Sequence, residues 1–393
     1  MTTITNVEDL RLAAKRRLPK SVFEFIDTGS YDEVTLRRNM SDFRDVQLRQ
    51  RVLIDVENRS TKTTLLGQAA AIPAAISSVG LSGLLCPDGK GEIYAARAAQ
   101  AAGIPFAMSV MSVASMEEIR DATGAPFWFQ VYMLRDRGAV QTLVDRALAA
   151  GCSTLVVTVC SQVPGQRHSD VKNGLSLPPR IGFHNFLEFA LKPRWALSAL
   201  ARRPARLGNL MGLAPVQDLG ALLRWSGEQL DTSLNWRDIA WLRERWPRKL
   251  LVKGILDCDD AREAVNAGAD AISVSNHGGT QLDGAPSAIA ALPGIVEAVD
   301  GRLEVLLDSG VRSGQDIFKA LAHGARGCLL GRAHLYALGA MGEHGVATAI
   351  QLISRELDVT MAKTGVRTVD EISTDVLWPP PAPRPANARS RKS

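Results

Sequence analysis

The feature that most constrains the fold is a regular alternation of short apolar segments with Ala-rich amphipathic segments, which begins at about Ala71. Apolar runs bounded by turn residues predict buried strands, and helical periodicity predicts the helices between them. The strand candidates are residues 72–79, 104–109, 126–132, 154–159, 250–253, 271–275, 303–308 and 327–330. The helix candidates are residues 92–102, 116–122, 137–150, 236–246, 259–267, 287–299, 313–322 and a segment that begins at Arg332.

Eight strand–helix units with short connections predict an α/β fold, namely a closed (β/α)8 TIM barrel. A doubly wound open sheet is the alternative, because periodicity alone does not show whether the sheet closes. In a barrel the functional side chains follow the C-terminal ends of the strands. We therefore look for a site in the loops that come directly after the predicted strands.

The remaining segments surround this alternation. We predict a single barrel domain over residues 1–377, with an N-terminal cap over residues 1–70 that contains two or three helices between residues 6 and 40. An insertion or mobile loop over residues 163–231 follows the fourth strand. Residues 378–393 are rich in proline and then basic, which predicts a disordered tail.

Composition excludes several classes of protein. No run of 18 uncharged apolar residues is present, and the N-terminus lacks the pattern of a signal peptide. The five cysteines are scattered without a CxxC pair, which indicates a reducing compartment and argues against a zinc site or a disulfide framework. The net charge of +5 is modest, and no nucleic-acid recognition motif accompanies it. We expect a cytoplasmic protein that binds neither a metal nor nucleic acid.

The insertion mixes aromatic and apolar side chains with bases over residues 181–211. A basic segment of this kind can lie on an anionic membrane surface, which would place the protein at the inner face of a membrane. Alternatively, the segment covers the active site or packs on a neighbouring subunit. The sequence leaves both interpretations open.

A histidine follows the sixth predicted strand. His277 stands beside Gly278 and Gly279, which let a flat ligand approach the backbone, and a side chain at this position is typical of a catalytic group. The alternative is a loop histidine that is satisfied by a backbone carbonyl group. The other predicted strand ends favour the catalytic interpretation, because they supply a matching phosphate site.

The loops after the last two strands predict that phosphate site. Gly310 and Arg312 follow the seventh strand, and Gly331 and Arg332 follow the eighth. Glycine N–H groups, a helix N-terminus and arginine side chains bind phosphate at this place in barrels. Asp308, at the end of the seventh strand, can accept hydrogen bonds from ribityl hydroxyls. The alternative for Arg332 is a pairing with a surface acid.

A lysine closes the fifth predicted strand. A buried and unpaired charge is costly, so we expect Lys253 to point into the mouth of the barrel. Next to a flavin it would stabilise negative charge on the reduced ring. Alternatively, it pairs with an acid such as Asp308.

These residues belong to motifs whose order and spacing are specific. The chain resembles the family of FMN-dependent α-hydroxy-acid oxidases and dehydrogenases, which includes glycolate oxidase, mandelate dehydrogenase and the flavin L-lactate dehydrogenases. The resemblance extends from about Val7 to Ile372 and is carried by residues 18–20, 35–39, 128–132, 251–254, 275–279, 307–312 and 330–332. The insertion is most similar to the membrane-associated lactate dehydrogenase branch, at residues 193–196 and 208–210.

The resemblance implies an FMN cofactor and a homotetramer. It implies that FMN is held by Ser77, Ser78, Gly80, Ser109, Gln130, Thr158, Lys253, Asp308, Gly310, Arg312, Gly331 and Arg332. His277 matches the catalytic base, Tyr132 an active-site tyrosine and Arg167 an arginine of the mobile loop after strand four. Gly80 matches a position that tends to be glycine in dehydrogenases and alanine in oxidases.

Three positions depart from the family pattern. Thr280 stands where the family has the arginine that clamps the substrate carboxylate, and a hydroxyl does not replace a charged fork. Phe25 stands where the family has a tyrosine whose hydroxyl contacts the same carboxylate. Cys160 replaces the aspartate that orients the catalytic histidine and raises its pKa. Ser78, in place of a proline, is a smaller change.

The departures remove groups for a small 2-hydroxy acid while the flavin motifs remain. We therefore predict an enzyme that oxidises a C–H bond beside a hydroxyl or amino group on another kind of substrate. His277 would take a proton while hydride passes to flavin N5, Tyr132 would polarise the reacting oxygen, and Arg167 would be the cation left for an acidic group. A conventional L-lactate or hydroxy-acid dehydrogenase and an inactive FMN-binding protein are the alternatives. The electron acceptor, whether quinone, another carrier or oxygen, is left open.

Overall fold

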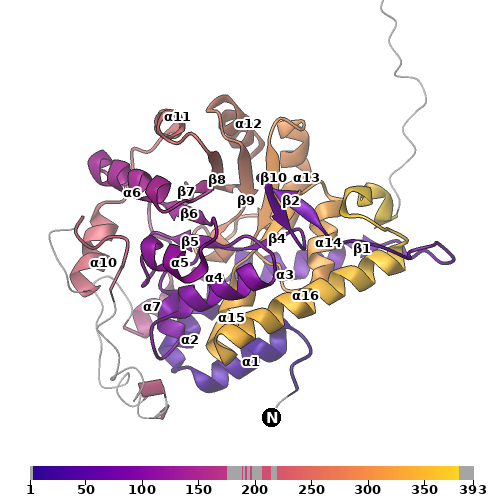
Figure 1. Cartoon of the computed structure of the whole chain (residues 1–393), viewed down its shortest axis with the longest axis horizontal. Helices are drawn as coiled ribbons and strands as arrows, with labels where there is room; N and C mark the ends of the chain where they lie inside the picture. Colours follow the sequence, from indigo (N-terminus) through magenta and orange to yellow (C-terminus); the bar gives the residue numbers. More distant parts are fainter. Residues whose placement is uncertain are drawn as a thin grey trace, which may run out of the picture.

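The computed structural model describes residues 3–174, 188, 191–192, 195–196, 206–213 and 219–379. The aromatic and basic residues predicted to contact a membrane lie largely outside this part of the chain, and so does the predicted tail beyond Pro379. Within it, three helices and short antiparallel strands precede the main sheet, as Figure 1 shows.

Eight parallel strands form the centre of the molecule (Figure 1). They are β4 (Ala74–Ile76), β5 (Ala107–Ser109), β6 (Trp128–Val131), β7 (Thr154–Thr158), β8 (Lys249–Ile255), β9 (Ala271–Val274), β10 (Glu304–Asp308) and β11 (Gly327–Leu330). Their order is β4-β11-β10-β9-β8-β7-β6-β5. A parallel bridge between Ile76 and Phe106 joins the two ends of this order. The sheet is therefore the predicted (β/α)8 barrel and not the open alternative.

The helices that follow the strands begin and end close to the predicted positions. They are α4 (Gly91–Ala101), α5 (Met116–Thr123), α6 (Arg137–Ala149), α11 (Trp236–Arg245), α12 (Cys258–Asn266), α13 (Ala288–Val299), α14 (Gly314–Ala322) and α15 (Arg332–Met341). Local capping sets several of these limits. Ser115 and Ser313 each begin a helix with a capping box, and Gly124 ends α5 in the left-handed conformation.

Two separate apolar clusters stabilise the barrel. One lies between the strands and the surrounding helices. The other includes Trp128, Val156, Leu251, Leu306 and Leu329 from alternate strand positions. The hairpin formed by β2 (Thr63–Leu65) and β3 (Gln68–Ala70) contributes Leu65 and Leu66 to this second cluster. Since the hairpin packs where several strands begin, the C-terminal ends of the strands are left for a site.

The N-terminal helices are α1 (Val7–Arg17), α2 (Lys20–Asp27) and α3 (Val34–Asp45), and they contact α13, α15, the C-terminal helix and the segment after β9. Helix α1 packs on α15 and on the long helix α16 (Glu343–Thr364) (Figure 1). Helix α3 contacts the loop after β9, because Asn39 and Asn276 exchange two amide hydrogen bonds of 2.8 and 2.7 Å. The cap therefore supports the loop that carries His277.

The described parts of the insertion after β7 contact the rest of the protein. The helices there are α7 (His168–Lys172) and α10 (Leu219–Glu228). Trp195 is buried, and the Lys192 ammonium group donates to the carbonyl oxygen of Arg16. Arg206 forms an ion pair of 2.9 Å with Glu118. These contacts are of the kind expected for a segment that packs on the protein itself.

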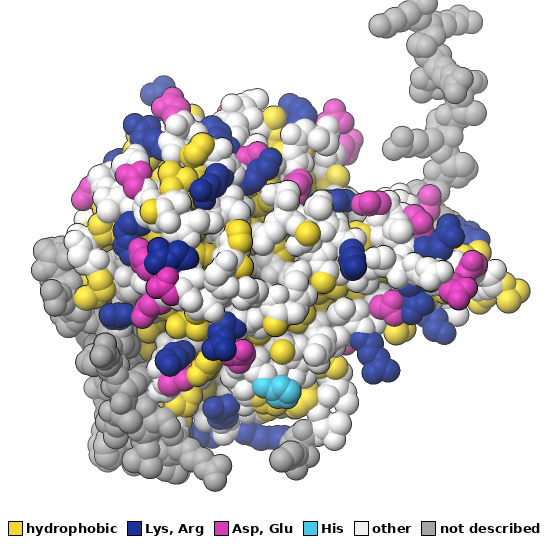
Figure 2. Space-filling view, in the orientation of Figure 1, with side chains coloured by type: hydrophobic (Ala, Val, Ile, Leu, Met, Phe, Trp, Pro, Cys, Tyr) yellow, Lys and Arg dark blue, Asp and Glu magenta, His cyan; other side chains and the backbone are white. Residues whose placement is uncertain are grey.

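Charges of both signs are interspersed over the face of the molecule that Figure 2 shows, without a broad basic area. None of the helices that the structure describes is long and apolar enough to cross a bilayer. Near the end of the described chain, β12 (Leu377–Trp378) pairs with β1 (Gln47–Leu48) in an antiparallel arrangement.

Candidate active site

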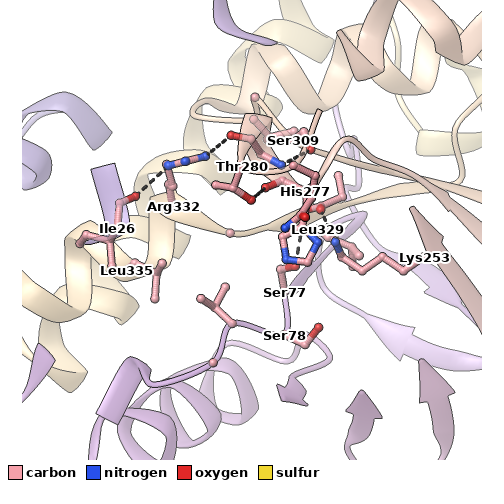
Figure 3. Close-up of a pocket in the computed structure, with 18 of the residues that line it drawn as sticks. Ile26, Ser77, Ser78, Lys253, His277, Thr280, Ser309, Leu329, Arg332 and Leu335 are labelled. Carbon is pink, nitrogen blue, oxygen red and sulfur yellow. Dashed lines mark hydrogen bonds and ion pairs between the residues drawn. The ribbon is translucent and has the colours of Figure 1, made fainter. Parts of the chain in front are cut away.

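A cavity of about 310 Å³ opens at the C-terminal ends of the strands. The predicted site residues that line it are Phe25, Ser77, Ser78, Gly80, Tyr132, Arg167, Lys253, His277, Thr280, Asp308, Gly310, Arg312, Gly331 and Arg332. Ser109, Gln130, Thr158 and Cys160 do not line it and lie at or after the ends of β5, β6 and β7. Residues far apart in the sequence thus meet around one space (Figure 3).

The loop after β9 presents His277 to this cavity. Its backbone is left-handed, with a φ of 57°, and Gly278 and Gly279 continue in positive φ. An added Cβ at Gly279 would lie 2.7 Å from the backbone nitrogen of Leu36, so only glycine fits against the cap there. The His277 N–H group donates to Ser275 Oγ over 3.1 Å, which fixes the base of the side chain.

The imidazole has two neighbours on its Nδ1 side. Cys160 Sγ and Ser161 Oγ each lie 3.3 Å from His277 Nδ1. The neighbouring β8 makes room for the thiol, because Gly254 has a φ of 113° and an added Cβ there would lie 2.7 Å from Cys160. Among the described residues, no backbone carbonyl group is the partner of this ring, in contrast to the alternative considered from the sequence. Since Nδ1 faces the thiol and the hydroxyl, Nε2 is the nitrogen left for a ligand.

The environment of His277 favours its neutral form. Burial, together with the positive charge of Lys253, lowers the pKa of His277 to about 3. Asp308 opposes this decrease, whereas Arg167 and Arg332 add to it. The pKa of the Cys160 thiol is raised by burial, so Cys160 supplies no negative charge to counter these cations. At neutral pH the ring is therefore uncharged and able to accept a proton.

Lys253 and Asp308 form a buried ion pair beside the histidine. Lys253 Nζ lies 2.8 Å from Asp308 Oδ2, and the two side chains are 4% and 8% exposed. Ser275 Oγ donates to the same carboxylate oxygen over 2.7 Å, and Ser77 Oγ contacts the other oxygen at 3.4 Å. Burial alone would lower the pKa of Lys253 and raise that of Asp308, but their pairing outweighs both effects. The pairing considered as an alternative for Lys253 is therefore present.

Arginine side chains at the cavity have backbone carbonyl partners. Arg332 donates to the carbonyl oxygens of Ile26, Gly278 and Thr28 over 2.7–2.8 Å, and it links α2 to the histidine loop (Figure 3). Burial lowers the pKa of Arg332 to about 10, so the guanidinium remains charged at neutral pH. The partners are carbonyl groups and not the surface acid considered from the sequence.

Arg167 is also engaged. Its guanidinium donates to the carbonyl oxygen of Phe25 over 2.6 Å, pairs with Asp170 at 3.1 Å and stacks over the Phe25 ring at 5.3 Å. Burial lowers its pKa. Within the described parts of the chain, the Arg312 guanidinium donates to the carbonyl oxygen of Val311 over 2.9 Å and lies over the Tyr336 ring. Arg312 therefore keeps more N–H groups for a ligand than Arg167 or Arg332.

The positions that depart from the family pattern carry uncharged side chains at this site. Phe25 and Thr280 line the cavity, and the Thr280 hydroxyl donates to the carbonyl oxygen of His277 over 2.7 Å. Tyr132 also lines the cavity, and burial raises the pKa of its hydroxyl, which therefore stays protonated. These three side chains offer hydroxyl groups and an aromatic ring rather than charge, and the nearby charge is that of Arg167 over the Phe25 ring.

The residues present fit the FMN that the resemblance implies. Gln130 Oε1 accepts from Ser109 Oγ over 2.9 Å, while the buried Gln130 Nε2 has no hydrogen-bond partner among the described residues. A buried amide donor of this kind needs an acceptor, and a flavin carbonyl would supply one. An added Cβ at Gly331 would meet open space, so the backbone there borders room for a ligand next to the start of α15.

Sequence reasoning missed several residues that the structure places in the site. Ser275 contacts Asp308 and Ser309, and the Ser309 hydroxyl accepts from the Gly278 N–H group. Met111 and Gln281 line the cavity. Ser275 is the last residue of one predicted strand and Ser309 directly follows another, so the position at a strand end was a signal for both. Ser161 had no such signal beyond its place next to Cys160.

Comparisons with known proteins agree with the fold and the site. The sequence model of the family described as FMN-dependent dehydrogenase matches residues 14–379. An L-lactate dehydrogenase from Caulobacter vibrioides is 47% identical over 376 residues, which cover 95% of this chain and 97% of that protein. The crystal structure of the monotopic membrane protein (S)-mandelate dehydrogenase has a TM-score of 0.90 and 38% identity and covers 96% of this chain and 99% of its own.

A further solved structure is that of a mandelate oxidase variant with 2-hydroxy-phenylacetamide. It has a TM-score of 0.78 and 35% identity, and it covers 93% of this chain and 96% of its own. The family match and these relatives extend over nearly the whole length of the chain. The protein belongs to the FMN-dependent dehydrogenase family and is a flavin-dependent oxidoreductase of the α-hydroxy-acid dehydrogenase and oxidase type that uses FMN.

Proposed function

We propose that this enzyme oxidises a C–H bond beside a hydroxyl or amino group in a substrate whose neighbouring acyl group is an amide or ester rather than a free carboxylate. The observation that carries the proposal is the uncharged wall formed by Phe25 and Thr280 beside His277. Burying an ionised carboxylate without a charged or multiple hydrogen-bond partner is costly, whereas an amide or ester accepts a single hydrogen bond at much lower cost.

The cations near this wall support the same proposal. Arg167 and Arg332 donate to the carbonyl groups of Phe25, Thr28, Ile26 and Gly278. A carboxylate that took up these same N–H groups would have to displace those bonds, although the buried Arg167 Nε–H has no hydrogen-bond partner among the described residues. Arg312 has more free N–H groups, but it stands with Gly310 and Gly331 at the predicted phosphate end. A neutral acyl group requires none of these rearrangements.

FMN, when bound, supplies the two-electron acceptor for this oxidation. Lys253 and Gln130 would hold its ring system, while Gly310, Arg312 and Gly331 would hold its phosphate. His277 acts as the base, and the neutral ring accepts the proton of the reacting hydroxyl or amine at Nε2. The protonated Tyr132 hydroxyl donates a hydrogen bond to the reacting oxygen or nitrogen. Phe25 excludes water from this end of the cavity.

A conventional L-lactate or 2-hydroxy-acid dehydrogenase is the second candidate, and the 47% identity to an L-lactate dehydrogenase favours it. It requires Arg167 and a backbone contact to take the place of the missing carboxylate clamp, and the buried Arg167 Nε–H has no hydrogen-bond partner among the described residues. For both candidate functions we propose a cytoplasmic protein with a peripheral membrane contact. The similarity to the monotopic (S)-mandelate dehydrogenase supports this contact. The crystallisation of a mandelate oxidase variant with 2-hydroxy-phenylacetamide supports the use of amides as test substrates.

Anaerobic reduction of the flavin by paired substrates tests the proposal. We would compare L-lactate with L-lactamide, (S)-mandelate with its amide, and alanine with alaninamide, each under the same conditions. The amides should reduce the flavin faster than the matching acids. Rapid reduction by L-lactate or (S)-mandelate would instead establish the conventional dehydrogenase, and no reduction by any member of the panel would favour the inactive protein.

Replacing Thr280 with arginine should restore affinity for acids. The arginine would project from the cavity wall and offer a bidentate, charged partner for a carboxylate, a contact that lowers the KM for L-lactate by about tenfold or more. Steady-state kinetics on L-lactate and L-lactamide measure the effect. Thr280→Met is the matched control, because it is similarly unbranched and long but uncharged. Equal KM values in the two variants would contradict the assigned position of the acyl group.

Replacing Cys160 with aspartate should shift the pH dependence of turnover. His277 must be neutral to accept a proton, so activity is present above its pKa and lost as the pH falls through it. The pKa of about 3 predicts a flat profile through the ordinary histidine range in the natural protein. A carboxylate beside Nδ1 would raise that pKa and move the acidic limb of kcat/KM upward by about one pH unit or more. Cys160→Asn, which adds no charge, should leave the limb in place.

A further inference from the structure

A described segment of the insertion after β7 reaches back to the barrel. Residues 207–210, which we call the hook, lie against the segment that connects β5 with α5, and Leu207 and Leu210 are buried. Gly208 N–H donates to the carbonyl oxygen of Ser112 over 3.0 Å. An added Cβ at Gly208 would lie 2.5 Å from the backbone nitrogen of Ser115, so the two backbones meet without room for a side chain.

Asn209 is the polar centre of the hook and is fully buried. Its Oδ1 accepts from the Met116 N–H group over 2.8 Å, and its Nδ2 donates to the carbonyl oxygen of Ser109 over 3.2 Å. Because an N–H group only donates and a carbonyl only accepts, these partners fix the orientation of the amide. The Asn209 carbonyl oxygen accepts from Arg146 over 2.7 Å, which holds the hook from the outer side.

Ser109, which Asn209 contacts, is hydrogen-bonded to two segments of the predicted flavin site. Ser109 Oγ donates to Gln130 Oε1 over 2.9 Å and accepts from the Met111 N–H group over 3.1 Å. The carbonyl oxygen of Met111 in turn accepts from the Leu81 N–H group over 2.9 Å. These hydrogen bonds, together with the covalent chain of Ser109 and Met111, link Asn209 to the loop after β4 and to the Gln130 amide. The buried Nε2 of Gln130 has no partner in the described chain.

From this arrangement we infer that Asn209 is a positioning residue for FMN. It acts through Ser109. The Ser109 hydroxyl sets the direction of the Gln130 amide, and Met111, which is hydrogen-bonded to this hydroxyl, holds the loop that carries Gly80. The insertion is therefore part of the cofactor site and not merely an addition beside it. The inference rests on the proposed place of FMN next to Gln130, and it assigns a role to a residue that does not line the cavity.

The variant Asn209→Asp separates this role from simple packing. Aspartate has nearly the same shape and keeps an acceptor for Met116 at the start of α5, but it loses the donor to Ser109 and sets a charge against that carbonyl oxygen. We expect the dissociation constant of FMN to rise about tenfold, measured by quenching of flavin fluorescence on titration of the FMN-free full-length protein. The absorption spectrum of the bound flavin should change with it.

Three further variants make the result decisive. Arg206→Ala removes an exposed ion pair with Glu118 next to the hook and should leave FMN affinity unchanged. Asn209→Ala should weaken FMN binding as well and lower the melting temperature more, and if it fails to fold, Asn209→Asp alone carries the test. Gln130→Ala tests the place of FMN itself.

If Gln130→Ala weakens FMN binding but Asn209→Asp binds FMN within about twofold of the natural protein, the inferred role of Asn209 is wrong while the proposed site stands. If Gln130→Ala has no effect, the proposed place of FMN fails. A lower melting temperature of Asn209→Asp with unchanged affinity and spectrum would show that Asn209 only stabilises the fold.

Discussion

Replacing His277 with asparagine is expected to slow reduction of the flavin by substrate by about 10²–10⁴-fold, because the reaction loses its base. Asparagine suits this position, since it tolerates the left-handed backbone found at His277 with a φ of 57°. It also keeps a polar side chain near Cys160 and Ser161. Single-turnover mixing of the FMN-loaded enzyme with its best substrate in the absence of oxygen measures the rate directly.

FMN binding should survive this substitution. The proposed cofactor contacts come from Lys253, Asp308 and the glycine loops, so the dissociation constant of FMN should change little. His323→Asn is the matched control, because His323 ends α14 and does not line the cavity. If His277→Asn reduced its flavin within about tenfold of the natural rate, a base at this position would not be needed, and the proposed mechanism would fail.

Most of the barrel follows from local information in the sequence. The segment from residue 271 to 275 is short, apolar and bounded by turn residues, and β9 occupies Ala271–Val274. Helix α5 begins after Ser115 and ends before Gly124, because both limits are set by side-chain or backbone chemistry within a few residues. By contrast, closure of the sheet depends on the pairing of its last strand, β11, with its first, β4, and these segments lie far apart in the sequence, so periodicity does not encode it.

The site shows the same division. That His277, Asp308 and Gly331 gather around one cavity follows from their positions at strand ends, which any (β/α)8 barrel brings together. The hydrogen-bond partners of the residues next to them cannot be predicted from the sequence, because they depend on side-chain directions and on loops that come from distant segments. Arg332 reaches carbonyl groups of the N-terminal cap, and Ser161 reaches His277 from the loop after β7. No spacing in the sequence reports either contact.

The family pattern and the structure together limit what the departures mean. Cys160 lies beside His277 Nδ1, where the resemblance places an aspartate, so the substitution acts on the proposed base itself. Phe25 and Thr280 line the same cavity, so they bear on the substrate. Relative to the family pattern, Thr280 and Cys160 each remove a charged group and Phe25 removes a hydroxyl, while Lys253 and Asp308 remain paired beside His277. This distribution is the one expected from the proposed change of substrate, whereas the Lys253–Asp308 pair would also be kept for its contribution to stability.

The second large effect is expected at that buried ion pair. Replacing Lys253 with methionine should lower the free energy of unfolding by about 3–5 kcal/mol at neutral pH, because it leaves the Asp308 carboxylate buried without its partner. Lys253 Nζ and Asp308 Oδ2 are 2.8 Å apart, and both side chains are almost fully buried. Urea unfolding of the FMN-free protein measures the change, since bound cofactor would add its own stabilisation.

A more exposed pair supplies the matched control. Lys249 and Asp270 lie 2.9 Å apart with side chains 48% and 24% exposed, so Lys249→Met should cost less than about 1 kcal/mol. Similar losses in the two variants would mean that burial adds nothing to the Lys253 pair. The double variant Lys253→Met with Asp308→Asn should recover part of the loss, because the amide carries no charge to bury.

The loss should also depend on pH with a definite sign. In the natural protein, burial would raise the pKa of Asp308, but Lys253 lowers it. The contribution of Asp308 to stability is therefore present above its pKa in the unfolded state and lost as the pH falls through its pKa in the folded state.

Without Lys253, the effect of burial dominates, and the pKa of Asp308 in the folded state rises above its pKa in the unfolded state. The carboxyl group then destabilises the folded state when it is ionised and not when it is protonated. The difference between Lys253→Met and the natural protein should therefore shrink as the pH falls toward about 4, the ordinary range of a carboxyl group. A difference that stays constant from neutral to acidic pH would show that the effect arises from lost packing and not from the unpaired charge.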